Sequence, residues 1–223
     1  MSPMWDIAER AAACYRRRGF WGFVKAASIY LLKKCQILPL VMSVIRRRRF
    51  RKLIKEKPLK LHLGCGSVHL DGYINMDVQD WAGACDLTAN AGDLHMFKDN
   101  SVDHIFNHAL LEHIPPWDTI KTLKEWNRVL KPGGRIQIEV PDLERIFQDW
   151  LVNKTLSEQE AIDNIYGGNK APNKVYSRQD HLTGFTYDRL TRMMSECSFT
   201  NFTRLEHPKY HHILVVRACK NGA

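Results

Sequence analysis

The stretch LHLGCGSVHLDGYINMD, residues 61–77, decides the fold class of this sequence. An apolar strand over residues 59–63 stops at the glycines Gly64 and Gly66, and a second strand over residues 73–77 ends on a carboxylate. Glycine lets the backbone turn sharply and approach a ligand closely. Because ligands of open α/β sheets bind where parallel strands end, the stretch predicts a nucleotide-like ligand at the carboxyl edge of a sheet.

The spacing within this stretch argues against a dinucleotide. His69 stands where the dinucleotide fingerprint has its third glycine, which serves close packing behind a pyrophosphate-binding turn. Asp77 follows Gly64 by 13 positions, against about 20 in that fingerprint. NAD and FAD are therefore disfavoured, the helix after the glycines is at most a single turn, and Asp77 is placed to accept hydrogen bonds from ribose hydroxyls.

The rest of the chain alternates between strand and helix patterns. This alternation predicts an α/β fold with a doubly wound, mostly parallel sheet and helices on both faces. Residues 167–183 form a polar stretch without periodicity, which is typical of a functional or mobile loop. The further predicted elements are strands over 102–107, 135–140, 203–206 and 212–218, and helices that begin at Pro116, after a capping box at Ser157 and after Thr186.

Composition narrows the class of protein. The chain has 223 residues, 44% hydrophobic and 26% charged, which suits one globular domain with an appendage. Its 6 cysteines are far apart and form no CxxC pair. A disulfide scaffold or a thiolate metal site is therefore not expected, and a reducing, cytoplasmic location is favoured.

The positive charge is concentrated at the N-terminus. Residues 1–60 hold 16 Lys+Arg against 3 Asp+Glu, a charge of +13. The remaining residues have a charge of −4, which gives the chain its net charge of +9. We therefore predict two parts: a basic amphipathic helical extension over residues 1–57 and a folded domain over residues 58–223.

Within the extension, the apolar stretch 19–45 is interrupted by Lys25, Lys33 and Lys34, which argues against a membrane-spanning helix. A helix that combines aromatic, aliphatic and many basic residues is typical of an in-plane anchor on anionic lipid. The sequence thus predicts a peripheral position on the inner face of the membrane. Two alternatives stay open: the helices pack on the domain or on a partner, or residues 46–52 contact RNA.

Two further stretches follow the first at suitable spacing, GDLHMFKDNSVDHIFNHALLEHI (92–114) and EWNRVLKPGGRIQIEVPDL (125–143). Together the three resemble the class I S-adenosylmethionine-dependent methyltransferases over residues 59–142. YGG (166–168) and HLTGFTYDRLTRMM (181–194) resemble a bacterial branch often associated with surface-polysaccharide synthesis. The resemblance implies a Rossmann-like methyltransferase fold, S-adenosylmethionine as cofactor, and methyl transfer to an oxygen or nitrogen atom of a small-molecule or saccharide acceptor.

The resemblance also implies roles for individual residues. The glycine turn would contact the methionine part and the ribose, Asp77 the ribose, Asp93 and the Leu94 N–H the adenine, and the residues after the fourth strand the sulfonium centre. Asp86 competes with Asp93 for the adenine role, and His62 stands where many members carry an acid. The cofactor-binding residues implied in this way are Gly64, Cys65, Gly66, Asp77, Asp93, Leu94, Asn107 and His108.

Glu112 and His113, just after the fourth strand, are the candidate catalytic residues. A histidine there can act as general base on an acceptor hydroxyl or amine, although it could also only hydrogen-bond the backbone. Tyr166 and His181 border the polar loop and are candidates for acceptor binding. No metal site is expected, since no histidine pair close in sequence has suitable geometry on a strand.

Two other readings remain. A non-catalytic module that binds S-adenosylmethionine would have no need of the full set of site residues. An RNA methyltransferase guided by the basic arm is disfavoured, because residues 107–110 read Asn-His-Ala-Leu where base-amine enzymes carry Asn-Pro-Pro-aromatic or Asp-Pro-Pro-aromatic. Nucleic acid is thus not an expected partner, and the sequence leaves the acceptor and the oligomeric state open.

Overall fold

The computed structural model describes residues 48, 50–80, 83–168 and 180–222. The chain divides into two compact units, Met1–Arg49 and Phe50–Ala223, and nearly all described residues belong to the second. The basic stretch up to residue 47 and most of the polar loop, residues 169–179, lie outside the described residues. Among the described helices, none is long and apolar enough to cross a membrane.

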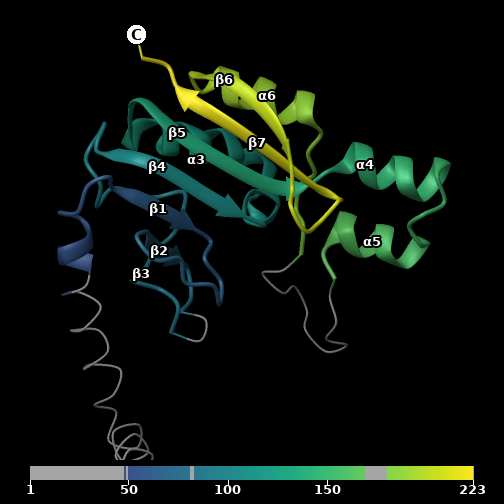
Figure 1. Ribbon diagram of the computed structural model, residues 1–223, viewed down its shortest axis with the longest axis horizontal. Helices are drawn as coiled ribbons and strands as arrows, with labels where there is room; N and C mark the ends of the chain where they lie inside the picture. Colours follow the sequence, from purple (N-terminus) through teal and green to yellow (C-terminus); the bar gives the residue numbers. More distant parts are fainter. Residues whose placement is uncertain (1–47, 49, 81–82, 169–179, 223) are drawn as a thin grey trace, which may run out of the picture. The chain divides into compact units, whose positions relative to one another are not determined.

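The second unit is built on a seven-stranded sheet in the order β3-β2-β1-β4-β5-β7-β6 (Figure 1). Strands β1 to β5 pair in parallel, whereas β7 runs antiparallel between β5 and β6. The carboxyl ends of β1, β2, β4 and β5 therefore meet at one edge, and the order of the strands reverses between β1 and β4. The strands are β1 Lys60–Leu63, β2 Ile74–Asp77, β3 Leu87–Thr88, β4 Val102–His108, β5 Leu130–Pro141, β6 Phe199–Glu206 and β7 Ile213–Lys220.

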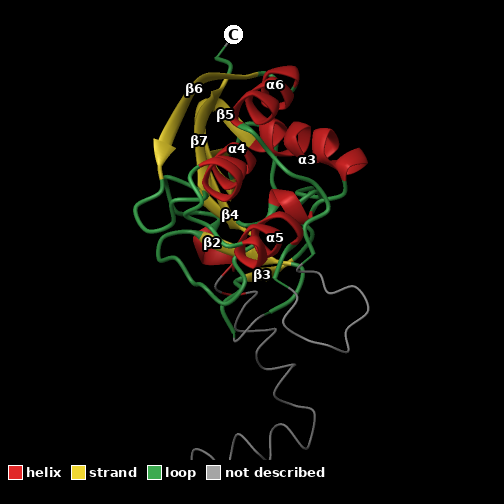
Figure 2. Cartoon of the chain, turned by 90° about the vertical axis from the view of Figure 1, so that its right-hand side faces the viewer, coloured by secondary structure: helices red, strands yellow, loops and turns green. Residues whose placement is uncertain are grey.

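Helices α3 and α6 pack side by side on one face of the sheet (Figure 2). Their apolar residues, among them Trp126 and Met194, enter a core with strand residues such as Ile105 and Ile138. In the described part of the chain, the strand residues of the opposite face line a hollow of about 560 Å³. The helices are α3 Pro116–Val129, α4 Leu143–Phe147, α5 Glu158–Tyr166 and α6 Tyr187–Glu196, with a 3-10 turn η1 Leu111–His113 and a π-helical turn η2 Gln148–Val152.

The expected mostly parallel, Rossmann-like sheet with flanking helices is confirmed, and most predicted elements are found within a few residues. Ser157 forms the predicted capping box with Glu160, and Thr186 caps α6. No helix lies between β1 and β2, as the short spacing predicted. The pattern missed β3, which is only two residues long, and the turns α4 and η2 after β5.

The domain begins earlier than the predicted boundary at residue 58. The second unit starts at Phe50, whose ring lies 6.0 Å from that of Phe97. Leu53 and Ile54 also pack against the core. The apolar residues at the end of the basic stretch therefore contribute to the folded domain.

Candidate active site

The glycine turn after β1 has the backbone conformation that its sequence predicted. Gly64 and Gly66 have positive φ angles of 68° and 53°. A Cβ on Gly64 would lie 2.9 Å from Leu110, on the loop after β4, whereas a Cβ on Gly66 would meet open space. Glycine at position 64 is thus required both by the backbone and by the close approach of the β4 loop.

Asp77 at the end of β2 is tied to this turn. Its Oδ2 accepts the N–H of Gly66 at 3.0 Å, and its Oδ1 accepts the N–H of Gln79 at 3.1 Å. Each carboxylate oxygen can accept a further hydrogen bond. The side chain of Cys65, by contrast, is buried with its Sγ 3.4 Å from that of Cys85, and its backbone N–H donates to the Met76 carbonyl at 3.0 Å.

The loop that carries Asp93 is fixed by α3. Trp126 Nε1 donates to the Ala91 carbonyl at 2.8 Å, and the Leu94 N–H donates to Glu125 Oε1 at 2.8 Å. The Leu94 N–H, which the resemblance assigned to adenine, therefore has a partner within the protein. Asp93 stays exposed, with its Oδ1 2.8 Å from His95 Nδ1.

Asp86, the competitor of Asp93, is only 2% exposed. Its Oδ2 accepts both the backbone N–H and the side-chain amide of Asn75, at 3.0 Å each. This places Asp86 in a structural network between β2 and β3. The exposed carboxylate available at this edge is that of Asp93.

Asn107 occupies the penultimate position of β4, beside Leu63 of β1. It is fully buried, and neither its Oδ1 nor its Nδ2 has a hydrogen-bond partner within the described residues. Leaving a buried amide unpaired is costly, so the group needs a partner that enters from outside the protein. With the glycine turn and Asp77, it fits a ligand that carries ribose and amino-acid groups.

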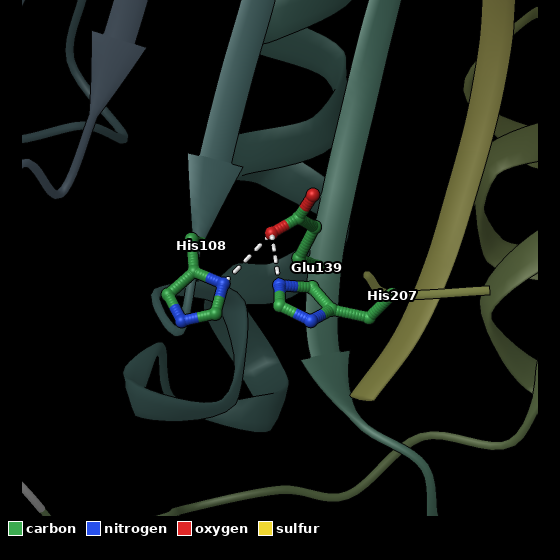
Figure 3. A group of neighbouring side chains, drawn as sticks. All are labelled: His108, Glu139 and His207. Carbon is green, nitrogen blue, oxygen red and sulfur yellow. Dashed lines mark hydrogen bonds and ion pairs between the residues drawn. The ribbon is translucent and has the colours of Figure 1, made fainter. Parts of the chain in front are cut away.

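His108, Glu139 and His207 lie together at the ends of β4, β5 and β6 (Figure 3). Glu139 Oε2 lies 2.8 Å from His108 Nδ1 and 3.6 Å from His207 Nε2. Directly after His108 the chain turns through Ala109, a non-glycine residue with a φ of 50°. Backbone strain of this kind is concentrated at functional sites.

The hydrogen bonds assign the protons in this group. His207 Nδ1 accepts the N–H groups of Lys209 and Tyr210, at 3.2 and 2.8 Å, so its proton is on Nε2 and points to Glu139. His108 donates its Nδ1–H to the same carboxylate and keeps a lone pair on Nε2, for which no partner exists among the described residues.

The pKa values agree with this assignment. The hydrogen bond to Glu139 raises the pKa of His108. Burial alone would raise the pKa of Glu139, but the hydrogen bonds from His108 and Gln137 outweigh it and hold that pKa below its usual value. The pair therefore combines an ionised carboxylate with an imidazole of strengthened basicity.

The predicted catalytic residues Glu112 and His113 lie next to the predicted acceptor residue His181. The two imidazole rings are 4.9 Å apart, and His181 Nε2 is 4.0 Å from Glu112 Oε1. Burial lowers the pKa of both histidines and raises that of Glu112 to about 7. Tyr166 is 66% exposed at the end of α5, and its carbonyl accepts the N–H of His181.

Comparison with known families gives the class of the protein. Residues 74–138 match the family described as "Methyltransferase domain", which spans β2 to β5 and includes Asp77, Asp93 and Asn107. This stretch, less than half of the chain, is similar to a methyltransferase domain. The match indicates an enzyme that is a S-adenosylmethionine-dependent methyltransferase, with S-adenosylmethionine as its cofactor.

Solved structures show the same fold. The chain is 13% identical to a S-adenosylmethionine-dependent methyltransferase from Archaeoglobus fulgidus, with a TM-score of 0.50, over 80% of this chain and 94% of that one. A Listeria monocytogenes protein assigned to the same class gives 13% identity and a TM-score of 0.51, over 80% and 99%. No curated protein matches the chain.

Sequence reasoning missed two residues of this candidate site. Glu139 lies on β5 at the position paired with His108, and His207 lies just past β6. Glu139 could have been found as a polar side chain at the carboxyl end of a strand adjacent to β4. His207 comes from the antiparallel part of the sheet, where only the order of the strands brings it to the site.

Proposed function

We propose that the methyltransferase transfers the methyl group of S-adenosylmethionine to an oxygen or nitrogen atom of a small-molecule or saccharide acceptor, with His108 as the general base. The observation that carries this proposal is the open Nε2 of His108, whose Nδ1–H is held by Glu139 at 2.8 Å. His108 directly follows the unpaired amide of Asn107. Consecutive strand residues point to opposite faces of the sheet, so base and cofactor site would meet beyond the carboxyl end of β4.

We assign cofactor binding to the residues gathered at the carboxyl ends of β1 to β4. Asp77 would accept the ribose hydroxyls, Asp93 would face the adenine, and Asn107 would pair with the amino-acid part. S-adenosylmethionine supplies a methyl carbon that is activated by positively charged sulfur. The remaining cofactor contacts would come from the backbone of Gly64, Cys65 and Gly66.

In the proposed reaction, the acceptor O–H or N–H gives its proton to His108 Nε2 while the acceptor atom bonds to the methyl carbon and the carbon–sulfur bond breaks. Glu139 keeps Nδ1 protonated and stabilises the imidazolium that forms, as a buried carboxylate does for a catalytic histidine. His207 faces the same carboxylate, with its Nε2 3.6 Å from Glu139 Oε2. Positioning of the acceptor supplies a further part of the rate.

We assign the proton transfer to His108 rather than to His113, which the sequence predicts, on basicity and geometry. Burial lowers the pKa of His113, whereas Glu139 raises that of His108. Glu112 is 1% exposed, which leaves it no direct access to an acceptor in solution. Glu112 and His113 remain at the same edge of the sheet, where a different role is argued below.

Two features favour a saccharide among the acceptors. Tyr210, 47% exposed, stacks on His207 with ring centroids 5.1 Å apart, and aromatic faces of this kind pack against the C–H faces of sugar rings. Residues 166–168 and 181–194 resemble a bacterial methyltransferase branch often associated with surface-polysaccharide synthesis. The +13 charge of residues 1–60 separately supports a peripheral position at an anionic membrane surface.

Labelled methyl transfer tests the proposal. The full-length enzyme with methyl-labelled cofactor should label a saccharide or another small molecule from the low-molecular-weight fraction of cells, and mass spectrometry would identify it. His108→Gln should lower kcat by about 10²- to 10⁴-fold with little change in cofactor affinity. His211→Gln, at an exposed histidine outside the site, is the matched control. Full activity of His108→Gln, or label found only in RNA, would contradict the proposal.

A further inference from the structure

The protons of His113 and His181 are fixed by backbone carbonyls. His113 Nδ1 lies 3.0 Å from the carbonyl oxygen of Asp180, and His181 Nδ1 lies 3.0 Å from that of Asn164. A carbonyl oxygen only accepts, so Nδ1 carries the proton in both rings and Nε2 keeps its lone pair. This is the arrangement of metal-binding histidines, which donate their other N–H to a carbonyl or carboxylate.

Glu112 lies beside the two rings, and the hydrogen-bond donor that faces its carboxyl group is its own backbone N–H. It is 1% exposed, and neither carboxyl oxygen has a hydrogen-bond partner within the described residues. The side-chain nitrogen that faces it is His181 Nε2, which lies 4.0 Å from Glu112 Oε1. Buried carboxylates are normally paired or bound to a metal, so this group lacks a cation that its position calls for.

We propose that Glu112, His113 and His181 bind a divalent transition-metal ion, for which zinc is the best match. One ligating atom of each residue lies within 4.8 Å of the others. Two ligands on tetrahedral zinc are about 3.3 Å apart for bond lengths of about 2.0–2.1 Å. Closing this group onto an ion therefore needs side-chain movements of about 1 Å, and a His2Glu set is a known catalytic zinc ligand set.

The backbone around the three ligands is preformed. The Glu112 carbonyl accepts the N–H groups of Leu182 and Thr183, at 2.8 and 3.2 Å, which joins η1 to the segment that carries His181. His181 is also tied to α5 through its own N–H, which donates to Tyr166. These contacts hold Glu112 and His181, which are 69 positions apart, close together in the folded chain. Binding of a metal ion therefore requires little further ordering of the backbone.

A second group has the same composition of two histidines and one glutamate, namely His108, Glu139 and His207. It differs in the ring nitrogen of His207 that carries the proton. One ligating atom of each also lies within 4.8 Å of the others. However, His207 Nδ1 accepts two backbone N–H groups, so the proton occupies the Nε2 that faces Glu139. A metal ion there would have to displace that proton while Nδ1 could not take it up. This group therefore serves as the matched control for the metal site.

A three-ligand site leaves a coordination position for water or for a substrate oxygen. Occupation of that position by an acceptor hydroxyl rests on the proposed function. Metal binding itself depends on neither the cofactor nor the acceptor. It is therefore measured in their absence, and its failure is distinguishable from failure of the proposed methyl transfer.

The experiment uses the full chain treated with a chelator, returned to metal-free buffer and titrated with zinc chloride by calorimetry. We expect one zinc ion per chain and an increase in the melting temperature on addition of zinc. His181→Gln and Glu112→Gln should each weaken binding by more than the roughly 10-fold to 100-fold that loss of an outer-shell partner costs. His207→Gln should bind zinc as the unaltered chain does.

Cobalt substitution separates this site from other ligands. Co2+ should give the visible d–d bands of a four-coordinate complex with nitrogen and oxygen ligands, and Glu112→Gln should change them. Sulfur-to-cobalt charge transfer in the near ultraviolet would show that cysteines are the ligands and would overturn the proposal. Absence of zinc binding, or loss of binding in His207→Gln with retention in His181→Gln, would overturn it equally.

Discussion

Nδ1 of His108 lies 2.8 Å from Oε2 of Glu139, across the parallel ladder between β4 and β5. The two residues are register partners, so the sheet itself sets their separation. The ladder thereby fixes which ring nitrogen carries the proton and leaves the other at the edge where the cofactor residues gather.

Glu139→Gln should move the pH profile of kcat/KM. The reactive form of His108 is unprotonated, so activity rises with pH through a pKa that Glu139 raises above 6.5. Glutamine removes the charge, which lowers the pKa of His108 and shifts the acidic limb to lower pH, with a lower maximal rate. The other groups facing His108 are His62, Glu112, His207 and Tyr210.

Initial rates over a pH series measure this shift, and Glu196→Gln, an exposed glutamate of α6, is the control that should leave the profile unchanged. An acidic limb that stays in place in Glu139→Gln would show that His108 is not the titrating base.

Asp77→Ala should weaken cofactor binding without unfolding the domain. The change removes a carboxylate that accepts the Gly66 N–H and that we assign to the ribose hydroxyls. Hydrogen bonds to a charged group contribute about 1.5–3 kcal/mol, so affinity should fall about 10- to 100-fold. Calorimetry with S-adenosylmethionine measures it, and Asp71→Ala at a fully exposed side chain is the control. Equal affinities would remove Asp77 from the site.

Asn107→Leu should have opposite effects on stability and on binding. In the free protein the buried amide has no partner within the described residues, and an unpaired polar group costs about 1–3 kcal/mol. An apolar side chain of similar size should therefore raise the free energy of unfolding in denaturant. It should also weaken cofactor binding, measured by calorimetry. A variant that is less stable and binds normally would contradict the assigned role.

Gly64→Ala should destabilise the domain more than Gly66→Ala does. Both positions have positive φ, which costs a non-glycine residue about 1–2 kcal/mol. At position 64 the added Cβ also lies 2.9 Å from Leu110, whereas position 66 faces open space. Urea unfolding of the two variants measures the difference. Equal losses of stability would show that the β4 loop moves aside at little cost.

Neutralising the basic clusters should weaken binding to anionic vesicles. Replacing Arg16–Arg18 and Arg46–Arg49 by glutamine in the full chain removes charges that each contribute about 1 kcal/mol near an anionic surface. Cosedimentation with vesicles at low and high salt measures it. Salt and the substitutions should reduce binding alike, and sedimentation insensitive to both would contradict an electrostatic anchor.

The sequence by itself determined the elements whose signals are local. Glycines after an apolar strand predicted the turn at residues 64–66, because only that residue type adopts positive φ at little cost. A carboxylate at a strand end predicted the place of Asp77, and hydroxyl caps predicted the starts of α5 and α6. Alternation of strands and helices then predicted the parallel sheet, because parallel strands need crossover connections.

Only the tertiary structure decided which distant side chains meet. The strand order brought Glu139 to His108, and η1 joined His181 to Glu112, 69 positions away. No spacing rule in one dimension encodes such pairs, because they depend on the register and stacking of separate elements. The same holds for the protons: the contrast between His207 and His181 rests on which backbone groups face Nδ1, and those contacts exist only in the folded chain.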